Sequence, residues 1–456
     1  MIRRAVILTL LATMVWGQTY MDPRGVGLCG AYTVASRGVS VVGFNPANLG
    51  FSTDVRFSMR LVGWDFRAYN NFVSLALFNQ YFTGDGRGNP LNLEARKPGT
   101  TMTHKEFLIS EIPENGVTFG LQTSIPYPAL NVSFGNYALT SGIDIYQQTI
   151  VPRGVFRLPL LGNEAYERFD FSFGQDVIII SHFDFSFSIP FEDFYVGTTV
   201  KYLMGLGFAG VDSTGGRLTT EPEGLLIDGF YRYTRAVGGN GLAVDIGMTM
   251  EPKNNWQFGF AINNLIGFVN WGNEENFVNK NIKLVETLIP IRQQLDIPDD
   301  GDVFAARTLY TYSGDTTNVT KFLSGTLEDL WNDDKQDVPT ADSIRMNYPA
   351  IVRLGASYDL PEEDLTIYMD LSTGLDDYYF ASRSWRLALA TEWTRFKRIP
   401  LRTGMAWGGF YGVEASLGSG FRLLWIDADI GLRLLGGMSL TKAEGVQLGI
   451  SVKFRR

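Results

Sequence analysis

The 456-residue sequence contains one cysteine and two histidines, and it lacks any long helix-like apolar run after its first residues. One cysteine cannot form an internal disulfide, which excludes a disulfide-stabilised scaffold. Two histidines without paired cysteines give no zinc-ligand spacing, so we expect no metal and no other cofactor. Because no run of about 18 apolar residues is present, the chain cannot cross a membrane as a bundle of helices.

Positive charge is also scarce. The chain has 39 basic and 48 acidic residues, a formal net charge of −9. Two arginines precede an apolar run, Ala5 to Met14, and a small-residue site ends at Gly17, which predicts a cleaved secretory signal over residues 1–17. Without this signal the balance is 37 basic against 48 acidic residues. Nucleic acid requires a basic face, so we expect no nucleic-acid partner.

Aromatic residues and glycine are abundant, at 13% and 50 residues, and many segments alternate strictly between apolar and polar positions. One face of such a segment is lipid-like and the other is small or polar, as in a transmembrane barrel strand. A soluble β-sandwich also alternates, but rows of about ten residues with aromatics near their ends favour the barrel. The clearest rows are Leu242–Met250, Trp256–Ile262, Trp385–Trp393 and Val446–Phe454.

These rows predict an all-β fold, a transmembrane antiparallel β-barrel of about 14 strands within a range of about 12 to 16. Bacterial barrels of one chain have an even number of strands, which guides the assignment. The strands are expected near residues 54–66, 116–135, 137–146, 176–189, 193–207, 240–251, 255–268, 349–360, 364–374, 384–395, 400–408, 412–420, 421–433 and 445–454.

The length of each connection depends on whether it follows an odd-numbered or an even-numbered strand. Short gaps rich in turn residues follow the even strands, and the long gaps follow the odd strands, as expected for short periplasmic turns and long outer loops. Leu225–Ala236 is assigned to a loop, because a further strand would break this parity. Pro126 and Pro128 make the second strand the weakest part of the prediction. The long gaps are residues 67–115, 147–175, 208–239 and 269–348.

Helical spacing occurs within these long gaps. Asn71–Phe82 and Lys105–Pro113 are expected to form short helices, and Val319–Trp331 another within the insertion 269–348. The insertion is interpreted as a solvated loop carrying one amphipathic helix. The alternative is a lid or partner-docking cap over the outer mouth.

A glycine-rich stretch, Gly25 to Gly50, precedes the first expected strand. Gly25, Gly27 and Gly30 spell G-x-G-x-x-G, but a dinucleotide site requires a preceding strand and a βαβ unit, and neither is present. These glycines are better explained by positive φ and close backbone approach in a packed loop.

The same stretch carries a family resemblance. Gly27-Leu28-Cys29-Gly30-Ala31-Tyr32-Thr33, followed by Asn45-Pro46-Ala47, resembles the "GLGGAYTA…NPA" signature of FadL-type and PorV-type outer-membrane barrels. Cys29 stands where glycine is usual. The order of strands and short helices is similar to an uncharacterised family of exported barrels related to the PorV group. The resemblance implies an N-terminal hatch inside the barrel.

The expected organisation is therefore a signal (1–17), a hatch or plug (18–52) and a barrel (53–456) integral to the bacterial outer membrane, in contact with its lipid. The hatch is expected to gate the lumen, with its proline turn fixed locally. Arg24 and Arg37 are expected to pair with the inward aspartates Asp427 and Asp429. The plug or gate residues are Gly25, Gly27, Gly30, Asn45, Pro46 and Ala47.

The polar rows of the strands predict the lumen lining. Its charge is mixed, which favours ion pairs over the single-sign ring of an ion-selective porin. The predicted lumen-facing residues are Arg56, Arg60, His182, Asp184, Asp245, Arg353, Arg386, Glu392, Asp427 and Asp429.

No catalytic motif accompanies the two histidines. His104 is expected in a loop, and His182 lies beside Asp184 without a serine nucleophile elbow, so we expect the protein not to be an enzyme. The FadL-type resemblance implies passive transport of a hydrophobic or amphipathic small molecule. The PorV-type resemblance implies a secretion-linked barrel that binds exported proteins. A structural outer-membrane protein is the third alternative.

Overall fold

The computed structural model describes most of the chain, and the expected signal, residues 1–17, lies outside the described part. The described ranges are 21–51, 56–83, 91–162, 164, 167–221, 224–272, 295, 305–315, 331–338, 344–376 and 381–456.

Fourteen antiparallel strand positions form a closed ring within these residues. Each strand pairs with its neighbours in ring order, and β2 and β3 together occupy one position. The ring runs β1 (Phe57–Asn70), β2 (Val117–Pro126) with β3 (Val132–Phe134), β4 (Tyr137–Val151), β6 (Gly174–Pro190), β7 (Phe194–Glu221), β9 (Gly239–Met250), β10 (Trp256–Trp271), β14 (Ile351–Leu360), β15 (Leu365–Gly374), β16 (Arg386–Trp393), β17 (Leu401–Gly408), β18 (Gly412–Leu423), β19 (Ile426–Leu435) and β20 (Gly445–Arg455).

The last strand closes the ring against the first. β20 pairs with β1 from Ser58 opposite Arg455 to Tyr69 opposite Gly445. β20 also pairs with β19 along its whole length, and β1 pairs with β2 and β3 on its other edge. Neither strand is left with an open edge, which is the condition for a sheet inside lipid. The predicted transmembrane β-barrel is confirmed as the fold.

Every strand of the ring overlaps one of the fourteen predicted segments, with ends that differ by several residues. The largest difference is β7, which continues to Glu221, well beyond the predicted end at residue 207. The second predicted strand is broken between Pro126 and Val132, where the sequence places two prolines. A proline cannot donate to the ladder, which explains the interruption.

The two faces of the wall differ as the alternation predicts. On β9, Leu242 and Met248 face outward and are exposed, whereas Ala243, Asp245 and Thr249 are buried. The same alternation occurs on β15, where Ile367 and Met369 are exposed and Tyr368 and Asp370 are buried. A barrel with an apolar exterior and a polar interior is typical of transmembrane barrels.

Outside the ring, the far half of β7 carries a sheet extension. Leu225–Ala236, which the parity argument assigned to a loop, forms most of a strand, so that assignment was wrong. This strand pairs with β7 rather than with two ring neighbours, and the parity of the ring is unaffected. The extension consists of β5 (Arg168–Asp170), β8 (Gly224–Ala236), β11 (Ala305–Asp315) and β12 (Trp331–Val338), and β13 (Ile344–Asn347) pairs with the end of β10.

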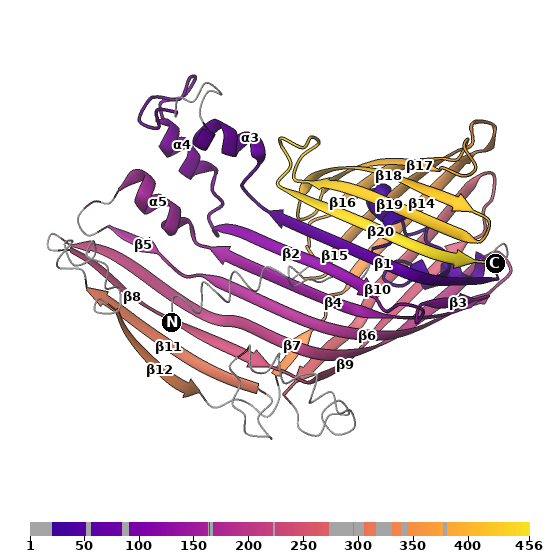
Figure 1. The fold of residues 1–456 in the computed structure, drawn as a ribbon, viewed down its shortest axis with the longest axis horizontal. Coiled ribbons are helices and arrows are strands. Elements are labelled where there is room, and N and C mark those ends of the chain that lie inside the picture. The colour runs from indigo at the N-terminus through magenta and orange to yellow at the C-terminus, as the bar shows by residue number, and fades with distance from the viewer. Residues whose placement is uncertain are drawn as a thin grey trace.

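Short helices gather beyond the ends of β1, β2 and β4, on the side opposite the C-terminus (Figure 1). Two match the predicted helical segments, and the third was missed. They are α3 (Leu75–Phe78) continued by the π-helical turn η4 (Asn79–Thr83), α4 (His104–Glu111) and α5 (Arg153–Leu161). The prediction of a helix over Val319–Trp331 falls mainly outside the described residues, and Trp331 itself begins β12.

None of the helices in the described part of the chain has the length and apolar character that a membrane-crossing helix needs.

The lipid-facing assignment predicts the cost of a charge on the outer wall. Met369, at the middle of β15, is 47% exposed, and Met102, which precedes α4 outside the ring, is 43% exposed. We expect Met369→Arg to lower the free energy of unfolding by about 2–4 kcal/mol, because it places a charge near the bilayer midplane. Met102→Arg is the matched control and should change it by less than about 0.5 kcal/mol. Denaturant titration of the barrel folded in lipid vesicles measures both, and equal effects would contradict the assignment.

Candidate functional site: the barrel interior

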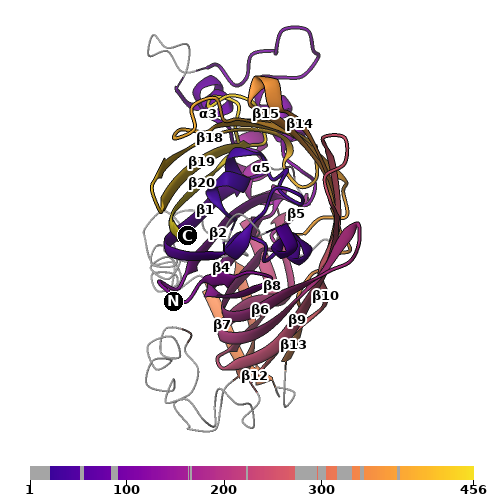
Figure 2. The same ribbon diagram turned by 90° about the vertical axis from the view of Figure 1, so that its right-hand side faces the viewer.

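The N-terminal segment, defined here as residues 21–51, packs against the inner wall from one side of the ring to the other. Its helix α2 (Pro23–Gly27) contacts β17 to β20, and its last turn η3 (Pro46–Phe51) contacts β6, β7 and β9. Between them, η2 (Gly38–Ser40) contacts β1, β3 and β4. Figure 2 shows the segment, in indigo, within the ring of strands. The segment therefore connects opposite walls of the barrel.

Asp22 ties the start of this segment to the closing strands. Its Oδ2 lies 3.3 Å from Nη2 of Arg60 on β1 and accepts a hydrogen bond from Ser40 Oγ at 2.6 Å. Lys453 on β20 forms a further ion pair with the same carboxylate. Burial by itself raises the pKa of Asp22, but Lys453 and Arg60 outweigh it and hold that pKa well below its ordinary range. The carboxylate is thus charged and bound to both strands.

Glu392 on β16 is the second link between the segment and the wall. Arg24 donates to Glu392 through Nε at 3.1 Å, and Arg402 on β17 donates through Nε at 2.7 Å. Arg402 also donates to Asp429 on β19 at 2.7 Å. Glu392 and Arg402 are each 3% exposed. Glu392 therefore bridges one guanidinium of the segment and one of the wall, and Asp429 supplies the second negative charge.

These contacts correct the expected pairing of Arg24 and Arg37 with Asp427 and Asp429. Arg24 pairs with Glu392, and Asp427 pairs instead with Arg455 at 3.1 Å. Arg37 donates to the carbonyl oxygens of Val34 and Ser36 within its own segment. The expectation failed because the depth at which each side chain lies in the lumen depends on the fold of the segment, which spacing in the sequence does not give.

Further bonds join the middle of the segment to the wall. The amide of Thr33 donates to Asp370 on β15 at 2.9 Å, and Arg386 on β16 donates to the carbonyl of Cys29 at 2.7 Å. Arg386 Nε also binds Glu414 at 2.6 Å. The segment is consequently bonded to the wall through side chains and through its own backbone.

Close backbone approach explains one of the predicted gate glycines. A Cβ added to Gly27 would lie 2.9 Å from the Cα of Gly418 on β18, closer than real Cβ contacts. Gly30 has a φ of +76°, which favours glycine. Cys29, which replaces the usual glycine, also has a positive φ, of +50°.

The Asn45-Pro46-Ala47 turn packs against the opposite wall. The Ala47 amide donates to Asn45 Oδ1 at 3.1 Å, which closes a local asparagine turn. Asn45 Nδ2 donates to the carbonyl of Met248 on β9 at 3.1 Å, and Ser188 on β6 donates to the carbonyl of Ala47 at 3.0 Å. A Cβ added to Gly197 on β7 would lie 2.3 Å from the Ala47 amide nitrogen, so glycine is required there.

An apolar cluster lines the inner wall toward the end of the strands that lies opposite the short turns. On β6, Ile178 and Ile180 share the inward face with His182, which lies farther along toward the short turns, and Leu203 on β7 is opposite His182. The rings of Phe208 and Trp271 lie 5.8 Å apart. The sequence prediction of a polar lumen missed this cluster, although three consecutive isoleucines at 178–180 interrupt the alternation. Its members are Tyr146, Ile178, Ile180, Leu203, Phe208, Ala236, Ala243, Val269, Trp271, Met346 and Tyr348.

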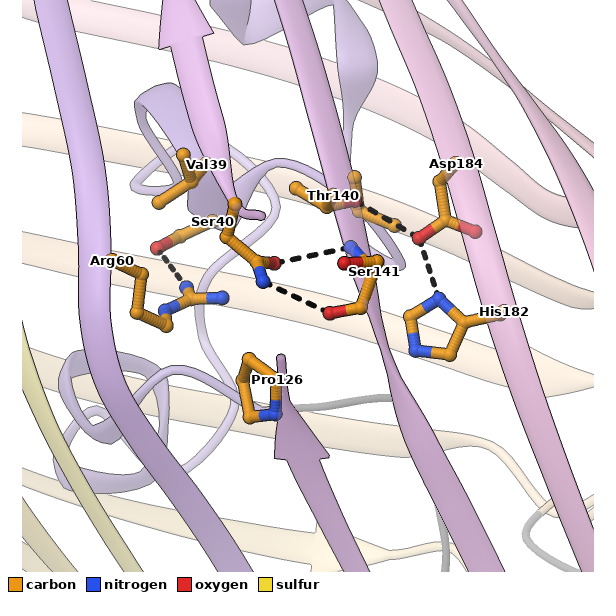
Figure 3. Close-up of a pocket in the computed structure, with 10 residues that line it drawn as sticks. Val39, Ser40, Arg60, Pro126, Thr140, Ser141, His182 and Asp184 are labelled. Carbon is orange, nitrogen blue, oxygen red and sulfur yellow. Dashed lines mark hydrogen bonds and ion pairs between the residues drawn. The ribbon is translucent and has the colours of Figure 1, made fainter. Parts of the chain in front are cut away.

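A small cavity of about 20 Å³ lies between the N-terminal segment and the break in the second strand position. Val39 and Ser40 line it from the segment, and Pro126 lines it from one end of the break (Figure 3). Asn131 lines it from the other end of the break. A cavity of this size holds about one water molecule. Asn131 Nδ2 donates to the carbonyl oxygens of Tyr127 and Ser141 and so bonds the break to β4.

His182 borders the same cavity. Its Nδ1 lies 2.7 Å from Asp184 Oδ2, and its Nε2 lies 3.7 Å from Asp144 Oδ2. Thr140 donates to the same oxygen of Asp184 at 2.9 Å (Figure 3). Among the described residues, no group of three or more histidine, cysteine, aspartate or glutamate side chains is arranged to hold a metal ion.

The model of a family of unknown function, DUF5723, matches residues 46–425. The chain belongs to the DUF5723 family. No curated protein matches it.

Solved structures resemble this DUF5723 barrel in fold. The P. putida toluene transporter TodX is 9% identical, with a TM-score of 0.50 over 96% of this chain and 99% of TodX. A deltaS2S3 mutant of the TodX monoaromatic hydrocarbon channel is 10% identical, with a TM-score of 0.50 over 97% and 99%. The Ralstonia pickettii toluene transporter TbuX is 13% identical, with a TM-score of 0.48 over 96% and 98%. The FadL-type resemblance is confirmed for the fold, and the PorV-type part stays a prediction.

The ten predicted lumen-facing residues of the DUF5723 barrel occupy three environments. Arg60, His182, Asp184, Asp245 and Glu392 are buried. Arg353, Arg386, Asp427 and Asp429 are half-buried, whereas Arg56 is exposed beside the start of β1. Asp245 pairs with Lys201 of the neighbouring strand at 2.9 Å rather than with the N-terminal segment.

The shared role of Glu392 predicts the effect of neutralising it. We expect Glu392→Gln to lower the free energy of unfolding by about 3–5 kcal/mol, because Arg24 and Arg402 lose their common buried partner. Glu363→Gln, at an exposed turn, is the control and should have an effect below about 0.5 kcal/mol. Urea unfolding of both variants in lipid vesicles tests this, and a loss under 1 kcal/mol for Glu392→Gln would refute the proposed link.

Proposed function

We propose that this DUF5723 barrel is a passive transporter of a hydrophobic or amphipathic small molecule in the bacterial outer membrane. The observation that carries the proposal is that one part of the lumen wall is apolar and another part is polar. An apolar cluster lines the wall toward the outer end, and the N-terminal segment joins opposite walls beside it. A channel for water and ions would be lined by polar groups along its whole length, including the part where the apolar cluster lies.

The apolar cluster supplies a contact surface for such a cargo. Leu203, Phe208 and Trp271 are buried, the first two on β7 and the third at the end of β10. Sites for small hydrophobic molecules are lined by aliphatic and aromatic side chains with a few polar groups at their border. His182 lies next to Ile180 on the inward face of β6, and Lys201 lies next to Leu203 on the inward face of β7. These two side chains provide the polar border.

The N-terminal segment is the proposed gate, with Gly25, Gly27, Gly30 and the Asn45-Pro46-Ala47 turn as the expected gate residues. It is bonded to the wall along its length, at Asp22 and Arg24 near its start, at Thr33 in its middle and at Asn45 near its end. Cargo passage requires the segment to shift or part of it to rearrange.

The likeness to TodX supports the transport proposal. TodX is described as a toluene transporter, and its likeness here concerns the fold. A fold can host several functions, so the proposal also depends on the lumen of this chain. The expectation that the protein is not an enzyme stays a prediction.

One observation favours a second candidate, a barrel that binds exported proteins. The extension formed by β8 and β11 continues the sheet beyond the ring on the side of β7 (Figure 1). Transport alone does not require this added surface. Capture of exported proteins by the purified barrel, lost when residues 224–236 are replaced by a short linker, would favour the second candidate.

The native cysteine offers a direct test of the gate. A Cβ built on Gly404 of β17 lies 2.8 Å from the Cβ of Cys29, so Gly404→Cys needs a shift of about 1 Å to reach disulfide geometry. We expect oxidation of Gly404→Cys to reduce uptake of radiolabelled toluene and of a labelled fatty acid by intact cells to the level of cells without the protein. Reduction of the disulfide should restore uptake.

The control is Gly404→Cys combined with Cys29→Ser, which cannot form the tether and should respond to neither oxidant nor reductant. Uptake that persists in the fully tethered protein would contradict the proposed gate. Wild-type uptake of neither compound above background would contradict the transport proposal itself.

A further inference from the structure

The short turns at the C-terminal end of the barrel separate positive from negative charge. The turns after β6, β9 and β14 carry mainly acidic residues, together with one lysine, Lys253. The turns around β17 to β20 carry a basic cluster, which adjoins the acidic turn after β14 through Arg395 and Asp364. The acidic residues are Glu192, Asp193, Glu251, Glu362, Glu363 and Asp364, and the basic cluster, called the basic rim here, is Arg395, Lys397, Arg398, Arg422 and Arg455.

The basic rim is continuous because its turns are bonded to one another. The Arg422 amide donates to the Arg398 carbonyl at 2.8 Å, which joins the β16–β17 turn to β18. The Arg455 amide donates to the Trp425 carbonyl at 2.8 Å, which joins the β18–β19 turn to β20. These residues are far apart in the sequence, and barrel closure brings them onto one stretch of the rim.

Part of this charge is compensated and part is not. Arg455 pairs with Asp427 at 3.1 Å, and Arg395 pairs with Asp364 at 3.6 Å. Lys397 and Arg398 are exposed, and within the described part of the chain no carboxylate lies within ion-pair distance of either. The centre of the basic rim therefore carries two uncompensated cations.

Exposed apolar side chains accompany these cations. Phe396 and Ile399 belong to the same turn as Lys397 and Arg398, and they are 57% and 45% exposed. Leu424 and Trp425 form the neighbouring turn, where Leu424 is 82% exposed. Turn positions in water favour glycine, asparagine and aspartate, so an apolar pair at a turn indicates a site that is not in bulk water.

The apolar turn residues continue the lipid-facing wall. Leu401 begins β17 beyond Ile399, and Leu423 and Ile426 flank the turn of Leu424, all with exposed side chains. Such continuity indicates that the same medium, lipid, covers the turns and the wall. Cations placed beside aromatic and aliphatic groups at this depth meet the headgroup region.

We propose that the basic rim binds an anionic phospholipid of the leaflet that faces the short turns. Lys397 and Arg398 contact its phosphate, and Phe396, Leu424 and Trp425 contact its upper acyl chains. Clustered lysine and arginine beside apolar groups attract acidic lipid, whereas the acidic turns after β6 and β9 repel it. The affinity for anionic lipid therefore differs from one part of the rim to another. This proposal does not rest on the proposed transport function.

The test uses the full chain purified in an uncharged detergent and titrated with short-chain phosphatidylglycerol or phosphatidylcholine. A ligand that binds the folded state raises Tm, so the concentration dependence of Tm gives an apparent affinity. We expect phosphatidylglycerol to stabilise the wild type and phosphatidylcholine to have little effect. Lys397→Gln with Arg398→Gln should lower the affinity for phosphatidylglycerol about thirtyfold, from the loss of two basic side chains near the lipid surface.

Lys253→Gln with Lys442→Gln removes the same charge at exposed positions outside the basic rim and should keep the wild-type affinity. Glycerol phosphate, the headgroup chemistry without acyl chains, should not raise Tm. The proposal is overturned if the control variant loses as much affinity as the rim variant, if the rim variant keeps its affinity, or if glycerol phosphate stabilises as well as the lipid. A baseline Tm of the rim variant equal to wild type excludes misfolding as the cause.

Discussion

The pairing of β20 with β1 is the interaction on which the rest of this structure depends. Backbone groups in the hydrocarbon core have no water to bond, so an open sheet edge there would leave a row of unsatisfied donors and acceptors. Closure removes that edge, since β1 is bonded to β20 on one side and to β2 and β3 on the other. It also fixes the distance across the lumen and the set of side chains that meet inside.

The interior follows from this closure. Inward rows of charged residues would be costly to enclose unless each charge met a partner. The N-terminal segment provides several of these partners, because Asp22 binds Arg60 and Lys453, and Arg24 binds Glu392. Such buried pairs contribute more to fixing the position of the segment than to net stability. Apolar packing holds the segment as well, because Leu28, Val34 and Phe44 lie in one buried cluster with side chains of the wall.

Much of the fold could be predicted from the sequence because barrel strands repeat a local pattern. The rows at Leu242–Met250 and Val446–Phe454 alternate so regularly that their faces are assigned correctly. The predictions were weaker where tertiary context intervened. Leu225–Ala236 forms β8 only because the long far half of β7 offers it an edge. Ile178 and Ile180 line the lumen because neighbouring strands surround them.

The interior site, like the fold, could be predicted from the sequence only in part. The sequence by itself determined the strand faces, the glycine-rich segment before the first strand, and the asparagine turn at Asn45-Pro46-Ala47, because each depends on residues close together in the chain. Only the tertiary structure decided that Arg24 meets Glu392 and that Arg398 adjoins Arg422. Those partners depend on how far strands are staggered around the ring and on where the segment lies in the lumen. Both are fixed by closure of the whole barrel, and no local spacing records them.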